Sequence, residues 1–535
     1  TGRAQPSLPL DLPQLVVVII VDGFPAEQLT KYSDQLGPGG LRLLVDEGAW
    51  FSDAHYGHSV TVTATGHATI MTGAHPERHG VIGNDWMDRE TQSRIYCVED
   101  PSHSYLGEPS GEGAGTSPRN LKVATVGDEL RGANGFSRIL AIAGKDRAAI
   151  LSAGRLGEAY FYSRQSGRFI TTSYYREEYP GWWQSFYSGN PQNRWFAKDW
   201  QLLLPEQAYD RSASDNRSYH RSSLGLGKAF PHPIDGGLGQ PGPAYYAALL
   251  RAPFGDEYTV EFARAAIRGE SLGKNPRGVP DLLVLGLSTH DYVNHLFGPE
   301  SRQSHDHLLR LDRVLAGLIS FLKGWVGLDK TAIILTSDHG FSYSPEHWAE
   351  MDLETGRIDP YQMISRLNEF LSSKFGPGTY AVSWFVPAIY LDYQQIKRND
   401  LDPLQVEEAA FRFLLWQTGI EAVLTRTQLE TGQLPKSRLG QQVASSWDST
   451  RSGDLVVIQK NRWHLMGDPD ALAAPHGSPY SYDTHVPLLF LGPWFKSGRY
   501  PLRVEIVDLA ATLARLLKLE LSSQAEGRVL IESLK

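Results

Sequence analysis

Residues 15–24, LVVVIIVDGF, indicate the fold of this chain. Seven consecutive apolar residues, rich in Val and Ile, are typical of a β-strand that is buried on both faces of a parallel or mixed sheet. The run ends at Asp22, and ligands of open α/β sheets bind outside the carboxyl ends of the strands. The stretch therefore predicts a buried strand with an acidic side chain at a functional edge of the sheet.

Two further apolar runs, at residues 282–287 and 332–335, lead into the polar motifs STHDYVNH and SDHG. A DTH motif precedes a third run near the end of the chain. Together these motifs supply side chains that suit Zn²⁺, which accepts imidazole nitrogen and carboxylate oxygen, better than Mg²⁺ or Ca²⁺. The candidates are Asp22, Asp291, His295, Asp338, His339 and His485. Two zinc ions about 4 Å apart would suit phosphoryl transfer.

The composition is that of a large folded protein with 535 residues, of which 41% are hydrophobic and 21% charged. A net charge of -9 without a block of like charge argues against a nucleic-acid-binding surface. The single cysteine, Cys97, excludes an intramolecular disulfide framework and a thiolate-rich zinc site. No apolar run approaches the length of a membrane span. The chain begins at Thr1 without a methionine, so we expect a removed signal peptide or a trimmed sequence.

Apolar runs that alternate with amphipathic segments predict an α/β fold, with a central mixed, mostly parallel sheet flanked by helices. Two long stretches interrupt this pattern, the first of them rich in aromatic and polar residues. We therefore expect a discontinuous core with two insertions. The predicted parts are core 14–153, inserted cap 154–275, core 276–343, second insertion 344–474 and core 475–535.

Residues 57–73, GHSVTVTATGHATIMTG, offer a nucleophile, because Thr61, Thr63 and Thr65 precede a helix expected to begin near Gly66. The amino end of a helix presents unpaired N–H groups and a positive dipole, which also hold phosphoryl oxygens. A nearby metal would lower the pKa of such a hydroxyl and activate it. The alternative is a β-strand of alternating Thr and Val whose last Thr caps the helix.

Lys145 and Arg147, in AIAGKDRAAI, form a candidate anion-binding pair. We expect an extended segment, which places both side chains on one face while Asp146 points away. Lys offers a point charge and Arg a planar fork, and together they suit a dianionic phosphate. A charged turn between two strands is the alternative.

Residues 61–85, TVTATGHATIMTGAHPERHGVIGND, resemble the nucleophile region of the alkaline phosphatase superfamily. The similar branch contains the nucleotide pyrophosphatase/phosphodiesterases and the monomeric PafA/PhoK-type bacterial alkaline phosphatases. In that branch the nucleophilic Thr stands four residues before the His of the Gly-His pair, which selects Thr63 here. The resemblance also implies that Asn84 donates a hydrogen bond to the phosphoryl oxygen, whereas His67 resembles a framework position.

The same resemblance implies an alkaline phosphatase-like fold with two zinc ions. One ion would be held by Asp291, His295 and His485 and would activate water. The other would be held by Asp22, Asp338 and His339 with Thr63, and would activate the nucleophile. The implied reaction is phosphoryl transfer to Thr63 followed by hydrolysis of the phosphothreonine.

GKDR is similar to the Lys-x-Arg pair of the PafA/PhoK-type phosphomonoesterases, which the diesterases lack. We therefore expect an alkaline phosphatase of broad specificity that releases inorganic phosphate, acts as a monomer and is exported to the periplasm or the medium. A phosphodiesterase in which GKDR is only a turn remains an alternative, as does a metal-stabilised binding module or inactive relative. Cys97 does not stand in the Cys-x-Pro-x-Arg setting of a sulfatase nucleophile.

Overall fold

The computed structural model describes residues 11–108, 115–466, 468 and 471–535. Within these residues, ten strands form one mixed sheet. Strands that are far apart in the sequence lie side by side in it. The order is β21 (Gly498–Tyr500), β2 (Ala49–His55), β20 (His485–Leu491), β13 (Thr331–Thr336), β1 (Leu15–Val21), β12 (Asp281–Leu287), β7 (Ile139–Ala143), β8 (Glu158–Tyr162) and β9 (Phe169–Ile170), and β22 (Val504–Glu505) pairs with β2.

The centre of this sheet is parallel, as the apolar runs predict. β13, β1, β12, β7 and β8 run in the same direction, whereas β20 and β9 are antiparallel to their neighbours. All seven residues of β1 are buried. Its odd-numbered residues join one hydrophobic cluster and its even-numbered residues another, because successive side chains of a strand point to opposite faces. The predicted mixed, mostly parallel α/β sheet is confirmed.

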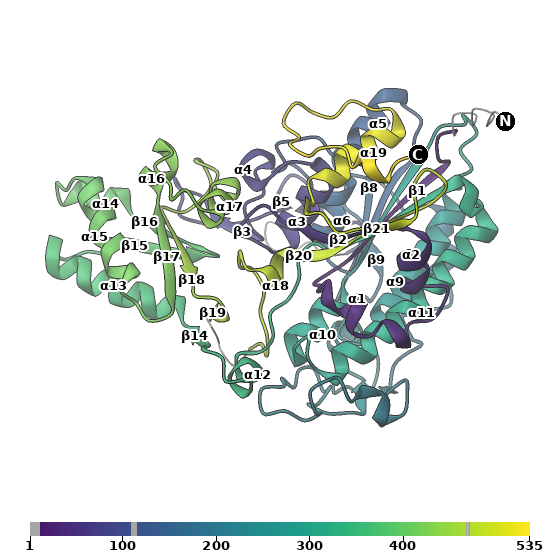
Figure 1. Cartoon of the computed structure of the whole chain (residues 1–535), viewed down its shortest axis with the longest axis horizontal. Helices are drawn as coiled ribbons and strands as arrows, with labels where there is room; N and C mark the ends of the chain where they lie inside the picture. Colours follow the sequence, from purple (N-terminus) through teal and green to yellow (C-terminus); the bar gives the residue numbers. More distant parts are fainter. Residues whose placement is uncertain (1–10, 109–114, 467, 469–470) are drawn as a thin grey trace, which may run out of the picture.

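Helices cover both faces of the sheet (Figure 1). On one face, α9 (Phe254–Gly269) and α11 (Arg302–Trp325) pack against the odd-numbered residues of β1. The opposite face is covered by α3 (Thr63–Thr72), α5 (Val126–Asn134), α6 (Asp146–Ala153) and α19 (Asp508–Leu517). Cys97 is buried in this second cluster.

The first insertion begins later than the sequence predicts. Residues 154–275 were expected to form a cap, yet β8 pairs in parallel with β7 and β9 follows as the last strand of the sheet. The short elements that follow are α7 (Gly181–Tyr187), β10 (Lys198–Trp200), β11 (His232–Ile234) and α8 (Pro243–Leu249). Their buried aromatic residues join the cluster on one face of the sheet, so this region shares the main core.

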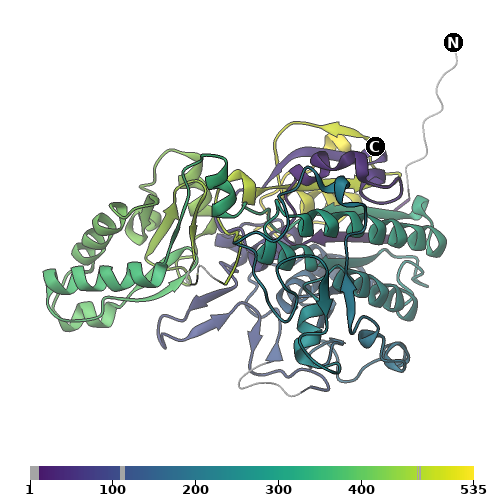
Figure 2. The same cartoon turned by 90° about the horizontal axis from the view of Figure 1, so that it is seen from below.

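The second insertion contains a small sheet of its own. β15 (Ala381–Phe385), β16 (Ala388–Leu391), β18 (Leu455–Gln459) and β17 (Ile420–Thr425) form an antiparallel sheet. The helices α13 (Pro360–Phe375), α14 (Tyr393–Arg398) and α15 (Pro403–Leu415) pack against it around a separate hydrophobic cluster. Figures 1 and 2 both show these green elements projecting to one side of the main sheet.

None of the helices within the described ranges combines the length and apolar character that a bilayer span needs.

Candidate active site

The candidate residues meet at the carboxyl edge of the parallel strands. Asp22 follows β1, and Asp338 and His339 follow β13. Asp291 and His295 lie four residues apart on α10 (Thr289–Phe297), the helix that follows β12. The edge of the sheet thus collects side chains that follow three strands, of which β1 lies more than two hundred residues before the other two in sequence.

Several ligand-type atoms of this cluster are buried and make no hydrogen bond within the described residues. They are Asp22 Oδ1, Asp291 Oδ1, Asp338 Oδ2, His339 Nε2 and His67 Nε2. An unsatisfied buried polar group costs about 1–3 kcal/mol, and more when it is charged. Five such atoms in one place therefore fit bound cations.

The spacing of these atoms also fits metal ligands. Asp291 Oδ1 lies 3.3 Å from His295 Nε2 and 3.4 Å from His476 Nε2. His339 Nε2 lies 3.5 Å from both Asp22 Oδ1 and Asp338 Oδ2. Zinc bonds of about 2.1 Å in a tetrahedron separate ligand atoms by about 3.4 Å.

Backbone carbonyl groups fix the orientation of three imidazoles. The Nδ1 atom of His295 donates to Ala474 O, that of His339 to Gly340 O and that of His476 to Thr61 O, at 2.8 to 2.9 Å. A carbonyl oxygen only accepts, so each ring carries a proton on Nδ1 and turns its Nε2 toward the cluster. Such partners commonly orient metal-binding histidines.

The electrostatics of the cluster demand positive charge. Burial and the charge of Asp22 raise the pKa of Asp338 to about 8. Burial alone would also raise the pKa of Asp22, but the Lys145 ammonium and the His339 imidazole together outweigh it and lower that pKa to about 2. Lys145 Nζ lies 2.7 Å from Asp22 Oδ2 and 2.6 Å from Asp291 Oδ2. One lysine does not balance the negative charge of three buried carboxylates, and bound metal ions would supply the remaining positive charge.

His485 does not join this cluster, which corrects its predicted role as a ligand beside Asp291 and His295. It lies directly opposite His55 in the β2–β20 pair, its ring stacks on that of His55, and its Nε2 donates to Ser52 O. His476, nine residues earlier, takes the expected place. The Asp483 carboxylate accepts hydrogen bonds from the backbone N–H groups of Gly477 and Ser478, and so holds the loop that carries His476.

His67 is a second difference from the sequence analysis, which interpreted it as a framework residue. Its Nε2 lies 3.7 Å from Asp338 Oδ2, and it groups with Asp22 and Asp338 as a possible ligand. Burial lowers the pKa of His67 to about 3, which leaves the imidazole in the neutral form that binds metals. The adjoining Thr63 motif was the available signal, since residues four apart share one face of a helix.

Thr63 is the first residue of α3, which therefore begins earlier than the predicted start near Gly66. Its hydroxyl is buried and lies 3.2 Å from Lys145 Nζ. The Ala64 backbone N–H donates to Asn84 Oδ1 at 3.1 Å, which fixes the amide of Asn84 beside the start of the helix. With Oδ1 occupied in this way, the amide nitrogen of Asn84 is left to donate to a ligand.

Lys145 and Arg147 do not lie in an extended segment, contrary to our expectation. Lys145 is the last extended residue before α6, and Arg147 lies in the first turn of that helix. The Asp146 carboxylate accepts a hydrogen bond from the Tyr96 hydroxyl, and Arg147 Nη1 lies 3.4 Å from that same hydroxyl. Both basic side chains nevertheless line one cavity of about 640 Å³.

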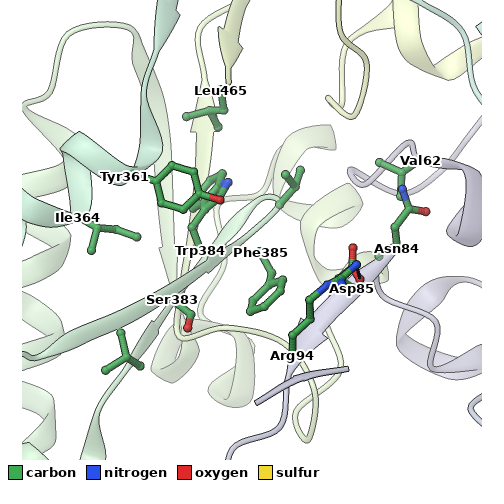
Figure 3. Close-up of a pocket in the computed structure, with 13 residues that line it drawn as sticks. Val62, Asn84, Asp85, Arg94, Tyr361, Ile364, Ser383, Trp384, Phe385 and Leu465 are labelled. Atoms are coloured by element: carbon green, nitrogen blue, oxygen red, sulfur yellow. Dashed lines mark ion pairs between the residues drawn. The ribbon is translucent and has the colours of Figure 1, made fainter. Parts of the chain in front are cut away.

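A second cavity of about 640 Å³ opens beside Asn84 and Val62. Figure 3 shows Trp384, Phe385 and Tyr361 of the second insertion facing Asn84 across this space. Both volumes are in the range of small-molecule sites. One cavity thus has an aromatic wall beside Asn84, and the other a basic wall beside Lys145.

Comparisons with known proteins identify the family to which the chain belongs. Residues 16–480 match the family model described as type I phosphodiesterase / nucleotide pyrophosphatase. Alkaline phosphatase PafA of Elizabethkingia meningoseptica is 32% identical, over 99% of this chain and 96% of that protein. Alkaline phosphatase PhoK of a Sphingomonas species is 31% identical, over 97% of this chain and 91% of that protein.

The fold agrees as well. The crystal structure of wild-type PafA superimposes with a TM-score of 0.90 at 30% identity, covering 99% of this chain and 100% of that one. The chain therefore belongs to the type I phosphodiesterase/nucleotide pyrophosphatase family and, within it, to the PafA/PhoK-type alkaline phosphatases, which makes it a phosphate monoester hydrolase.

Proposed function

We propose that this alkaline phosphatase transfers the phosphoryl group of a monoester to Thr63 at a site for two zinc ions, and then hydrolyses the phosphothreonine. The observation that supports this most is the convergence of unpaired carboxylate and imidazole atoms around the Thr63 hydroxyl. We assign Asp291, His295 and His476 to one ion. Asp22, Asp338 and His339, with Thr63, are assigned to the other.

When bound, two zinc ions would neutralise the buried carboxylates, lower the pKa of the attacking hydroxyl and of a water molecule, and stabilise charge on the transferring oxygens. The protein's own groups do the rest. Thr63 stands at the amino end of α3, where the positive end of the helix dipole favours an anionic oxygen. Asn84 donates from its amide nitrogen to a phosphoryl oxygen, which stabilises the charge that develops there.

Lys145 and Arg147 account for the choice of a monoester. A monoester phosphate has one more negative charge and one more free oxygen than a diester, and a lysine with an arginine satisfies both. Lys145 already donates to the Thr63 hydroxyl, so the ammonium lies beside the reacting atom. Arg147 lines the same cavity from the first turn of α6. Specificity beyond the phosphate is broad in this proposal.

The test compares p-nitrophenyl phosphate with bis-p-nitrophenyl phosphate at alkaline pH with added zinc, for the wild type and for Lys145→Ala/Arg147→Ala. We expect the monoester to be the better substrate, and the double change to reduce its kcat/KM at least tenfold more than that of the diester. Mass spectrometry after acid quenching should show a phosphate on Thr63. A faster diester reaction, or an equal loss with both substrates, would refute the monoester assignment.

Diester hydrolysis is the second candidate, because the matching family model is described as a phosphodiesterase and nucleotide pyrophosphatase. The same two assays separate the candidates. In a diesterase the Lys145–Arg147 pair would have no second negative charge to bind, so its removal would affect both substrates alike.

A further inference from the structure

Tyr292, the residue after Asp291 on α10, is surrounded by basic side chains. Lys145 Nζ lies 5.2 Å from the centre of its ring, and the guanidinium carbons of Arg164 and Arg251 lie 5.5 and 5.3 Å away. Arg164 also donates to the Tyr292 hydroxyl at 2.6 Å. Three cations from three separate elements thus converge on one aromatic ring.

Lys145 has the carboxylates of Asp22 and Asp291 as partners, but the two arginines lack such compensation. Within the described residues neither Arg164 nor Arg251 forms an ion pair. Arg251 donates only to Ala247 O of its own turn. It is partly buried, and burial lowers its pKa because no carboxylate opposes the desolvation.

Two carboxylates, those of Glu108 and Asp146, line the same cavity. Both oxygens of Glu108 accept hydrogen bonds from serine hydroxyls, those of Ser163 and Ser166. Asp146 is bonded to the Tyr96 hydroxyl and to the Arg147 backbone N–H. The acidic groups of this cavity are therefore engaged away from Arg164 and Arg251.

A partly buried guanidinium without an acidic partner carries uncompensated charge, and an anion would pair with it through strong, charge-assisted hydrogen bonds. The basic cavity of about 640 Å³ is lined by Lys145, Arg147, Arg164 and Tyr292. It leaves room for more than a phosphoryl group. Arg164 belongs to the turn between β8 and β9, and Arg251 follows α8, so both lie outside the motifs that hold the reacting phosphate.

We propose that the cavity beside Tyr292 binds a second anionic group of the substrate, so that the enzyme prefers phosphate monoesters carrying another phosphate. This inference rests on the proposed function, because it places the scissile phosphate at Thr63 between Lys145 and Asn84. Arg164 contacts the second anion directly. Arg251 does not line the cavity, but its guanidinium carbon lies 5.3 Å from the centre of the Tyr292 ring and supplies additional positive charge.

The test uses two substrates that differ by one phosphate, fructose 6-phosphate and fructose 1,6-bisphosphate. Initial rates of phosphate release are measured for both substrates. Under these conditions only the first phosphate released from each bisphosphate molecule contributes to the rate. We expect the wild type to show a kcat/KM about tenfold higher for the bisphosphate, mainly through KM, since a charge-assisted hydrogen bond is worth roughly that factor. Arg164→Gln and Arg251→Met should each remove most of this preference.

Arg168→Gln is the matched control, because Arg168 lies in the same turn but over the rings of Trp183 and Tyr187. It should keep the wild-type preference. Arg164 is exposed, so its replacement is not expected to unfold the protein. Thermal unfolding checks that Arg164→Gln and Arg251→Met are both folded. Equal kcat/KM for the two sugars in the wild type, or a preference that survives Arg164→Gln, would overturn the inference.

Failure of the proposed function would look different. If bis-p-nitrophenyl phosphate proves to be the better substrate, the two fructose phosphates are instead tested as inhibitors of its hydrolysis. Stronger inhibition by the bisphosphate that disappears in Arg164→Gln would support the second anion site in a diesterase. Equal inhibition by both sugars would refute it.

Discussion

Replacing His476 with alanine should release zinc from the site, whereas the same change at His485 should not. His476 Nε2 lies 3.4 Å from Asp291 Oδ1, in the group that also contains His295. His485 groups instead with Asp53 and His55. The two histidines lie in one stretch of the chain, and His485→Ala is therefore a matched control.

The size of the effect follows from the ligand count. A structural zinc site with four ligands contributes about 10–16 kcal/mol, or roughly 3 kcal/mol for each ligand. Because 1.4 kcal/mol is about a factor of ten, loss of the His476 imidazole should weaken zinc binding by at least about a hundredfold. Alanine cannot replace the Nε2 atom, and the neighbouring Asp291 carboxylate is left without that partner.

The assay titrates apo-protein with zinc against a chelating indicator and follows p-nitrophenyl phosphate hydrolysis at each free zinc concentration. For His476→Ala, one of the two bound equivalents should need at least about a hundredfold more free zinc. His485→Ala should bind zinc like the wild type, although loss of its stacking on His55 lowers the thermal stability. Zinc loss in His485→Ala with normal binding in His476→Ala would refute this assignment.

Three other changes test separate parts of the site and the core. Thr63→Ala should remove the phosphoenzyme seen after acid quenching and reduce kcat at least about a thousandfold, while Thr63→Ser keeps a hydroxyl and retains measurable turnover. Asn84→Ala should reduce kcat/KM about a hundredfold, because it removes one donor to the developing charge. Burial raises the pKa of Glu300 to about 7 from 4.5, so the stability it contributes is present below pH 4.5 and is lost as pH rises through 7. Glu300→Gln should remove up to about 3 kcal/mol of that pH dependence, measured by urea unfolding between pH 4.5 and 8; an unchanged slope would contradict it.

Local sequence patterns predicted the central strands closely. β1 spans Leu15–Val21, the whole of the apolar run, because a strand buried on both faces must be apolar at every position. The motifs after β1, β12 and β13 reach one place because the carboxyl ends of parallel strands share an edge. Asp22, Asp291, His295, Asp338 and His339 therefore came together as expected.

The sequence did not determine the conformation around Lys145. A spacing of two residues is compatible with a strand, but β7 ends at Ala143 and α6 begins at Asp146, so Arg147 already belongs to a helix. The Tyr96 hydroxyl, fifty residues earlier, bonds to Asp146. Such a contact leaves no trace in the local pattern of polar and apolar residues.

His476 and His485 show most clearly where sequence alone is insufficient. Both belong to the polar stretch that leads into β20, of which His485 is the first residue, and either has the right chemistry for zinc. The tertiary structure decides between them. Pairing of β20 with β2 turns His485 toward His55, while Asp483 holds the loop that presents His476 to Asp291. Periodic patterns record burial and strand direction because they repeat along the chain, whereas the direction of one side chain in a loop depends on hydrogen bonds to residues far away in sequence.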